Sequence, residues 1–253
     1  MKEKDEDRFF GVFNTVTGGE FLDSKCIGKP VDGTFVFLPA DYKSLELSSG
    51  IKAMFALITE VLGSDGNFGT GNLNHHIDAL LIDHPLMGSR VVEFDEEVNF
   101  TPPRKFTLQI LRDYSDYSFI SPYLLICNDL RYLNGYVIPK YQIKAGIHTY
   151  PATIRTLIEW LDEHVTSSVA HVEAKPGFNY LGGRMSQRAY YDTILDVAHL
   201  ARQNDHLSPP LRFAKRTFEE LFHKSFGNMT NDEIAEGIRR LLNSYYDFTL
   251  PPV

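Results

Sequence analysis

The chain has 253 residues, of which 43% are hydrophobic and 13% aromatic, and its formal net charge at pH 7 is −8. A chain of this size can form one large domain or two modest ones with a sizeable core. The negative charge argues against a protein that coats nucleic acid through bulk electrostatics. It does not exclude a nuclease, which needs only a local positive field around its site.

Targeting and redox features are sparse. The sequence has no run of about 18 apolar residues, so we expect no membrane span. Residues 1–8 are charged and lack the apolar stretch of a secretory signal. Cys26 and Cys127 are far apart and form no metal or redox motif. We therefore expect a cytoplasmic protein with reduced thiols.

The first half of the chain alternates strand-like and helical patterns. Glycine pairs and short apolar runs indicate turns between strands, and apolar residues at helical spacing indicate a helix. The predicted elements are a hairpin or small β subdomain at 9–37, a helix at 51–62 closed by Gly63, a hairpin with strands at 75–82 and 90–96 and a loop at 83–88, and a helix at 104–114 opened by Thr101-Pro102-Pro103.

The second half becomes increasingly helical. The predicted elements are strands at 123–127, 135–143 and 168–175, a helix at 152–164, a helix at 186–201 capped by Ser186, a helical segment at 215–226 and a last helix opened by the capping box Thr230–Glu233. We predict an α/β or α+β fold, with a mixed sheet flanked by helices. Residues 1–180 are expected to form the α/β domain, with a core at about 49–114, and residues 181–253 a helical C-terminal subdomain packed on it.

The second predicted hairpin carries three carboxylates. Side chains alternate along a strand, so Glu93 and Asp95 share one face, and an antiparallel partner brings Asp78 near Glu93. Bare carboxylates would be costly in such apolar strands. Grouped carboxylates also raise each other's pKa, and a hard divalent cation such as Mg²⁺ removes the repulsion. The pattern therefore predicts a metal-dependent hydrolase site.

These residues resemble a known family. Ile77-Asp78-Ala79-Leu80-Leu81, then Val91-Val92-Glu93-Phe94-Asp95-Glu96, then Phe100-Thr101-Pro102-Pro103-Arg104, in the order helix, Asp strand, Glu-x-Asp strand, helix, are similar to the core of the PD-(D/E)xK nuclease superfamily. The closest resemblance is to the branch in which an acid replaces the final Lys, as in very-short-patch-repair-like and related predicted restriction endonucleases. It covers residues 49–114, about a quarter of the chain.

The resemblance implies a role for each matching position. Asp78 matches the metal-binding Asp, Glu93 the acid of (D/E)xK, and Asp95 the Lys position. Glu60 matches an additional acid that some members supply from their first core helix. With the carbonyl oxygen of Phe94, these residues would bind Mg²⁺, for which Mn²⁺ can substitute, and the ion would lower the pKa of a bound water.

Because Asp95 occupies the Lys position of the (D/E)xK pattern, another residue must supply the positive charge at the predicted site. Lys105 or Arg104, on the helix after the acidic strand, would supply the cation and contact DNA. Asn99 stands where a His often follows the second acid, and His76 would support a ligand or contact DNA. The expected activity is a Mg²⁺-dependent, type II restriction-like endonuclease acting on double-stranded DNA. A two-fold target would favour a homodimer, with a cognate DNA methyltransferase acting separately.

Other patterns leave alternatives open. The literal Glu-x-Lys of Glu173 and Lys175 is a rival centre, and Lys175 could instead supply a cation to the Asp78 site. The glycine-rich residues 66–71 lack a P-loop Lys and indicate a loop. His75 and His84 are interpreted as loop polarity. Two function hypotheses also compete with the nuclease: a non-catalytic nucleic-acid-binding or interaction protein with a degraded nuclease fold, and a helical toxin-like ribonuclease using Arg216 and His223.

Overall fold

The computed structural model describes residues 4–18, 20–23, 38–39, 42–68, 74–75, 77–128, 175–179, 183–204 and 206–250. The strands are β1 Glu20–Asp23, β2 Leu38–Pro39, β3 Asn74–His75, β4 Ala79–His84, β5 Gly88–Asp95 and β6 Leu211–Ala214. The α-helices are α1 Asp5–Thr17, α2 Ser49–Val61, α3 Pro102–Arg112, α4 Ile120–Cys127, α7 Gly183–Asp196, α8 Lys215–Phe222 and α9 Asn231–Tyr246. Short 3-10 helices cover Tyr42–Ser44, Glu97–Asn99, Ala198–Leu200, Arg202–Asn204 and Phe226–Asn228.

The main sheet is mixed, as the sequence predicts. Its strand order is β1-β4-β5-β6, and β2 pairs with β3 in a separate two-stranded sheet. β4 runs antiparallel to both β1 and β5, whereas β6 runs parallel to β5. A parallel pair requires a long crossover between its strands, and the chain from β5 to β6 contains α3, α4 and α7.

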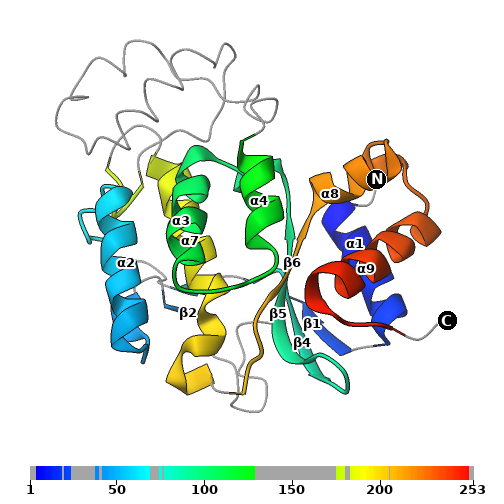
Figure 1. Ribbon diagram of the computed structural model, residues 1–253, viewed down its shortest axis with the longest axis horizontal. Coiled ribbons are helices and arrows are strands. Elements are labelled where there is room, and N and C mark those ends of the chain that lie inside the picture. Colours follow the sequence, from blue (N-terminus) through cyan, green and yellow to red (C-terminus); the bar gives the residue numbers. More distant parts are fainter. Residues whose placement is uncertain are drawn as a thin grey trace, which may run out of the picture.

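Helices cover both faces of this sheet (Figure 1). On one face α2, α3, α4 and α7 pack over a core that includes Val91 of β5 and Leu80 of β4. On the other face α1, α8 and α9 cover Val92 and Phe94, the alternate residues of β5. This arrangement confirms an α/β architecture, and it places the C-terminal strand β6 within the same sheet as the predicted hairpin.

The first element is a helix, so the hairpin predicted from residue 9 is wrong over residues 9–17. Phe9, Val12, Phe13 and Val16 recur at helical spacing and are buried on one side of α1. Their rings and methyl groups pack on the β5 and β6 face, where Phe9 stacks on Phe94 with ring centroids 4.5 Å apart. The glycine pair read as a turn instead ends the helix, because Gly18 adopts the left-handed conformation at φ 65°.

The predicted helices at 51–62 and 104–114, the second hairpin and the last helix with its capping box are confirmed. Residues 123–127 are a correction: they belong to α4, not to a strand. A short apolar run has no periodicity that separates a buried strand from a helix. Ser186 does not cap α7, which begins at Gly183 and buries Ser186 in its interior.

Some predictions fall outside the described residues. These are the strand at 135–143, the helix at 152–164, the strand at 168–175 except for its last residue, and residues 24–37 of the predicted hairpin or small β subdomain. No helix in the described ranges combines the length and hydrophobicity needed to cross a lipid bilayer.

Candidate active site

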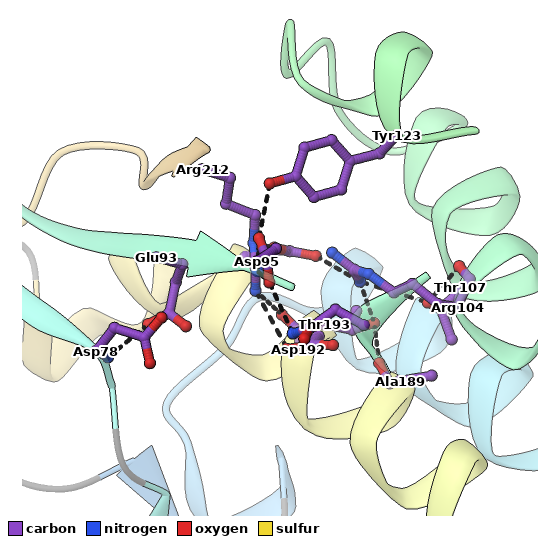
Figure 2. Close-up of polar contacts among 12 residues, drawn as sticks. Asp78, Glu93, Asp95, Arg104, Thr107, Tyr123, Ala189, Asp192, Thr193 and Arg212 are labelled. Atoms are coloured by element: carbon purple, nitrogen blue, oxygen red, sulfur yellow. Dashed lines mark hydrogen bonds and ion pairs between the residues drawn. The ribbon is translucent and has the colours of Figure 1, made fainter. Parts of the chain in front are cut away.

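The β4–β5 hairpin brings Asp78 and Glu93 together, as predicted. In its antiparallel register Ala79 faces Val92, so Asp78, the residue before β4, lies opposite Glu93. The backbone N–H of Asp78 donates to Glu93 Oε1 at 3.1 Å. The N–H of Phe94 donates to Asp78 Oδ2 at 2.9 Å. Figure 2 shows the two carboxylates side by side.

The environment of this pair disfavours its charged form. Glu93 is only 5% exposed, and burial raises its pKa well above the ordinary value, with a further increase from Asp78. Burial likewise raises the pKa of Asp78 to about 7, although the hydrogen bond from Phe94 opposes the shift. Among the described residues no cation forms an ion pair with either carboxylate. The pair therefore has unneutralised charge when both groups are ionised.

Asp95 does not join this pair, which corrects the predicted cluster of three acids. Arg212 Nη1 lies 2.9 and 2.8 Å from the two carboxylate oxygens of Asp95. Tyr123 donates to Oδ2 at 2.6 Å, and Asn99 Nδ2 donates to Oδ1 at 2.7 Å. Because both oxygens are occupied and the side chain is 1% exposed, Asp95 is not available to a metal in this structure.

A second correction concerns Arg104, which was expected to contact DNA. The side chain is 1% exposed, and Nη1 lies 2.9 Å from Asp196 Oδ2. Asp196 also accepts a 2.6 Å hydrogen bond from Arg212 Nε. Arg104 therefore belongs to a buried ion network that joins α3, α7, β5 and β6, and it does not face solvent (Figure 2).

The acid pair opens onto a cleft of about 440 Å³. Its acidic wall includes Asp78, Glu93 and Glu6, the last from the first turn of α1. Basic side chains line the other parts of the cleft: Lys175, Arg184 and Arg188. Carboxylates and cations thus border one cavity, an arrangement suited to a ligand that carries both a metal ion and anionic groups.

Lys175 reaches the cleft from a tight turn. Its backbone exchanges hydrogen bonds with Phe178, at 3.1 and 2.8 Å. Gln187 of α7 donates to the carbonyl of Pro176 at 3.1 Å, which ties the turn to the helix. Gly177 has φ +85°, and a Cβ there would lie 2.7 Å from the Phe68 ring, so the turn requires glycine at this position.

The other predicted site residues divide into two groups. Phe94 and Asn99 line the cleft together with Asp78 and Glu93. Glu60 is exposed on α2, and Lys105 is half-buried on α3. Neither Glu60 nor Lys105 is among the described residues that border the cleft, so their predicted roles as ligand and catalytic cation lack geometric support. His76 lies outside the described residues.

The residues of the alternative sites predicted from the sequence, Glu173, Lys175 and His84, are placed as follows. Glu173 lies outside the described residues, whereas Lys175 borders the same cleft as Asp78. His84 Nδ1 accepts hydrogen bonds from the N–H groups of Leu86 and Met87, so its ring stabilises the hairpin turn.

Arg216, His223 and the described part of residues 66–71 are not among the residues that line the cleft. Arg216 and His223 border a shallow depression at the end of α8, where Arg216 pairs with Glu220 at 2.8 Å. Of the glycine-rich residues 66–71, those at 66–68 form a turn after α2 in which Asn67 N–H donates to Asp65, and those at 69–71 lie outside the described residues.

The oxygen donors at the cleft suit Mg²⁺ better than softer metal ions. Asp78 and Glu93 are hard oxygen donors held together, and Mg²⁺ commonly binds one or two carboxylates while keeping several waters. No group of three or more His, Cys, Asp or Glu side chains in the described ranges is arranged to hold a metal. The residues therefore fit a Mg²⁺ that completes its coordination with water or substrate oxygens, and they do not fit an all-protein cage.

Four residues that line the cleft or form the buried ion network beside it were not identified from the sequence: Glu6, Asp192, Asp196 and Arg212. Glu6 was hidden in a charged N-terminal run that showed no role. Asp192 and Asp196 are four residues apart among apolar neighbours, and Arg212 interrupts the apolar run Leu211–Ala214. The sequence did contain a signal for the last three, because each is a charged residue within an apolar segment. Burying a charged side chain costs free energy unless it is paired, so such residues indicate buried ion pairs.

Comparison with protein-family models, curated proteins and solved structures gives no match to this chain.

Proposed function

We propose that this protein is a Mg²⁺-dependent endonuclease that hydrolyses phosphodiester bonds in DNA. One observation carries the proposal: the buried Glu93 and the half-buried Asp78 form a carboxylate pair, with no ion-pair partner among the described residues, at a cleft that also presents Lys175, Arg184 and Arg188. A carboxylate pair alone repels an anionic substrate. Carboxylates and cations bordering the same cleft suit a site in which a metal binds one part and phosphate oxygens the other.

Asp78 and Glu93 would hold the metal, with the carbonyl oxygen of Phe94 as a third oxygen donor. When bound, Mg²⁺ supplies a water of lowered pKa and neutralises charge on the scissile phosphate. The N–H of Phe94 orients Asp78 through its 2.9 Å hydrogen bond. Burial of Glu93 strengthens its electrostatic interaction with any cation.

The cations would bind the substrate. Lys175 borders the cleft as a point charge, in the role left open by the missing Lys of the (D/E)xK pattern. Arg184 and Arg188 lie one turn apart on α7 and can donate to successive phosphate oxygens. Restriction-type cleavage by a homodimer remains the finer proposal, with a separate cognate methyltransferase as its expected partner.

A second candidate is a binding protein without catalysis. It is favoured by one observation, the two hydrogen bonds from Arg212 to Asp95, which remove the third acid from the site. Such a protein would use the same cleft to bind nucleic acid and would leave the phosphodiester intact.

The test is cleavage of plasmid and oligonucleotide DNA with Mg²⁺ or Mn²⁺. We expect Glu93→Ala and Asp78→Asn to lower the cleavage rate by about 10²-fold or more, because each removes a group required at the reacting phosphate. Glu60→Ala, an exposed acid away from the cleft, is the matched control and should cut normally. Glu173→Ala tests the rival centre.

Discrete fragments would support restriction-type cleavage. DNA that is shifted in a gel but never cut, by the wild type as well as the variants, would favour the binding protein. Normal cutting by Glu93→Ala would place the active site elsewhere and contradict the proposal.

A further inference from the structure

Asp95 is buried close to the acid pair but does not contact it (Figure 2). It follows Glu93 by two residues on β5, so both side chains leave the strand on the same face. In the part of the chain that the structure describes, Asp95 does not line the cleft and shares no hydrogen bond with Asp78 or Glu93. Its effect on the pair must therefore pass through its charge or through the backbone of β5.

Three different elements hold the Asp95 carboxylate. β6 supplies Arg212, which contacts both oxygens at 2.9 and 2.8 Å. α4 supplies Tyr123, whose hydroxyl donates to Oδ2 at 2.6 Å. The 3-10 helix after β5 supplies Asn99, whose Nδ2 donates to Oδ1 at 2.7 Å. Hydrogen bonds to an ionised carboxylate are roughly twice as strong as those between neutral groups, so these contacts fix the side chain in place.

The end of β5 has a neighbouring strand on one side only. Within the described residues, pairing between β4 and β5 ends at Val92, and the last three residues of β5 pair with β6 alone. On the open side the N–H of Phe94 donates to Asp78 Oδ2 at 2.9 Å, where a paired strand would supply a carbonyl. A segment with fewer backbone hydrogen bonds opens at a lower free-energy cost, so the strand end needs a further anchor. The contacts of Asp95 provide this anchor.

The geometry of the acid pair depends on this strand end. Glu93 is part of it, and Asp78 is oriented by the N–H of Phe94. The N–H of Asp78 in turn donates to Glu93 Oε1 at 3.1 Å. A displacement of the strand end would therefore change the separation of the two carboxylates, and Mg²⁺ tolerates little departure from octahedral coordination.

We infer that Asp95 is a positioning residue, which fixes the end of β5 and so holds Asp78 and Glu93 at the separation that a divalent cation requires. The inference rests on the proposed function for the cation, and it gives Asp95 a role different from that of the metal ligand predicted from the sequence. Replacing groups that orient metal ligands commonly weakens metal binding by about 10–100-fold. Loss of a contact to Asp95 should therefore weaken metal binding even though no ligand is changed.

Tyr123→Phe is the principal test, because it removes one hydrogen bond to Asp95 and keeps the buried ring in place against Phe100. The full chain is titrated with Mn²⁺ by calorimetry in the absence of DNA, and its unfolding by urea is followed separately in EDTA. Only binding that disappears in Glu93→Gln is counted, since that variant removes a ligand of the pair. We expect Tyr123→Phe to bind Mn²⁺ about tenfold more weakly while it remains folded.

Tyr117→Phe is the matched control. The Tyr117 hydroxyl lies 3.2 Å from His199 Nε2 and makes no hydrogen bond to Asp95, so this substitution also removes a hydrogen bond of a tyrosine. It should lower stability toward urea and leave the Mn²⁺ affinity unchanged, which separates positioning from a general loss of stability. Asp95→Asn should weaken Mn²⁺ binding by about tenfold or more, and Tyr123→Phe should add nothing to that loss, because the hydroxyl acts through Asp95.

Wild-type Mn²⁺ affinity in Tyr123→Phe, an equal loss in Tyr117→Phe, a further loss when Tyr123→Phe is added to Asp95→Asn, or a wild-type protein that binds no Mn²⁺ at the pair would each overturn the inference. The proposed function fails by a different result, when DNA is not cleaved with Mg²⁺ or Mn²⁺. A protein that never cleaves can still lose Mn²⁺ affinity in Tyr123→Phe, and a nuclease dependent on Glu93 can keep it.

Discussion

Every nitrogen of the Arg212 guanidinium has a partner among the described residues. Nη1 contacts Asp95, Nε donates to Asp196 at 2.6 Å, and Nη2 donates to the carbonyl of Asp192. The backbone of Arg212 is held as well, since Tyr246 donates to its carbonyl and accepts from its N–H. One side chain thereby links β5, which carries Glu93, to α7, which lines the cleft.

We predict that Arg212→Met lowers the free energy of unfolding by about 3–5 kcal/mol, because it leaves the buried carboxylates of Asp95 and Asp192 without the cation that pairs with them, whereas Asp196 keeps Arg104. Urea denaturation followed by circular dichroism measures the change. Arg216→Met is the control: this arginine pairs with Glu220 on the surface of α8, and its loss should cost less than about 1 kcal/mol. A loss below about 1 kcal/mol for Arg212→Met would contradict the role assigned to the network.

Among the secondary-structure elements, a helix was predicted correctly where the sequence contains its capping residues. Thr230 accepts from the N–H of Glu233 at 3.2 Å, and Glu233 accepts from the N–H of Thr230 at 2.7 Å, which forms the predicted capping box of α9. α1 and α4 were missed for different reasons. The spacing of α1 was outweighed by glycine pairs interpreted as turns, and the apolar run of α4 has no clear period.

We predict that Thr230→Ala lowers the free energy of unfolding by about 0.5–2 kcal/mol, because it removes the acceptor for an N–H at the start of α9. Thermal and urea unfolding measure this. Thr15→Ala is the matched control, since Thr15 is exposed within α1 and, among the described residues, its hydroxyl donates to the carbonyl of Gly11 in the same helix. Equal effects of the two substitutions would show that the capping box does not stabilise the protein.

For the whole molecule, the acid pair makes stability depend on pH. Burial raises the pKa of Asp78 to about 7 and that of Glu93 well above its ordinary value. A carboxyl with a higher pKa in the folded protein than in the unfolded chain binds its proton more tightly when folded. Its contribution to stability is complete below the unfolded value near pH 4 and is lost as the pH rises through the folded value.

We therefore expect the metal-free protein to melt at a lower temperature at pH 8 than at pH 5.5. Mg²⁺ should raise the melting temperature at pH 8 and have little effect at pH 5.5, where protons compete for the same oxygens. Calorimetry in EDTA and in MgCl₂ tests both expectations. Glu93→Gln should weaken the pH dependence and abolish the Mg²⁺ effect. If Mg²⁺ stabilises Glu93→Gln as much as the wild type, the ion binds elsewhere.

The sequence alone was sufficient for the mixed sheet with flanking helices, for α2, α3 and α9, and for the approach of Asp78 to Glu93. These features depend on local periodicity, end signals and the register of one hairpin, all of which are encoded within short segments. Only the tertiary structure decided which charges are neutralised. Arg212 reaches Asp95 from a strand 117 residues later in the chain, and Arg104 reaches Asp196 across the α3–α7 contact. Ion pairs between distant elements depend on how those elements pack, and no local pattern in the sequence specifies that packing.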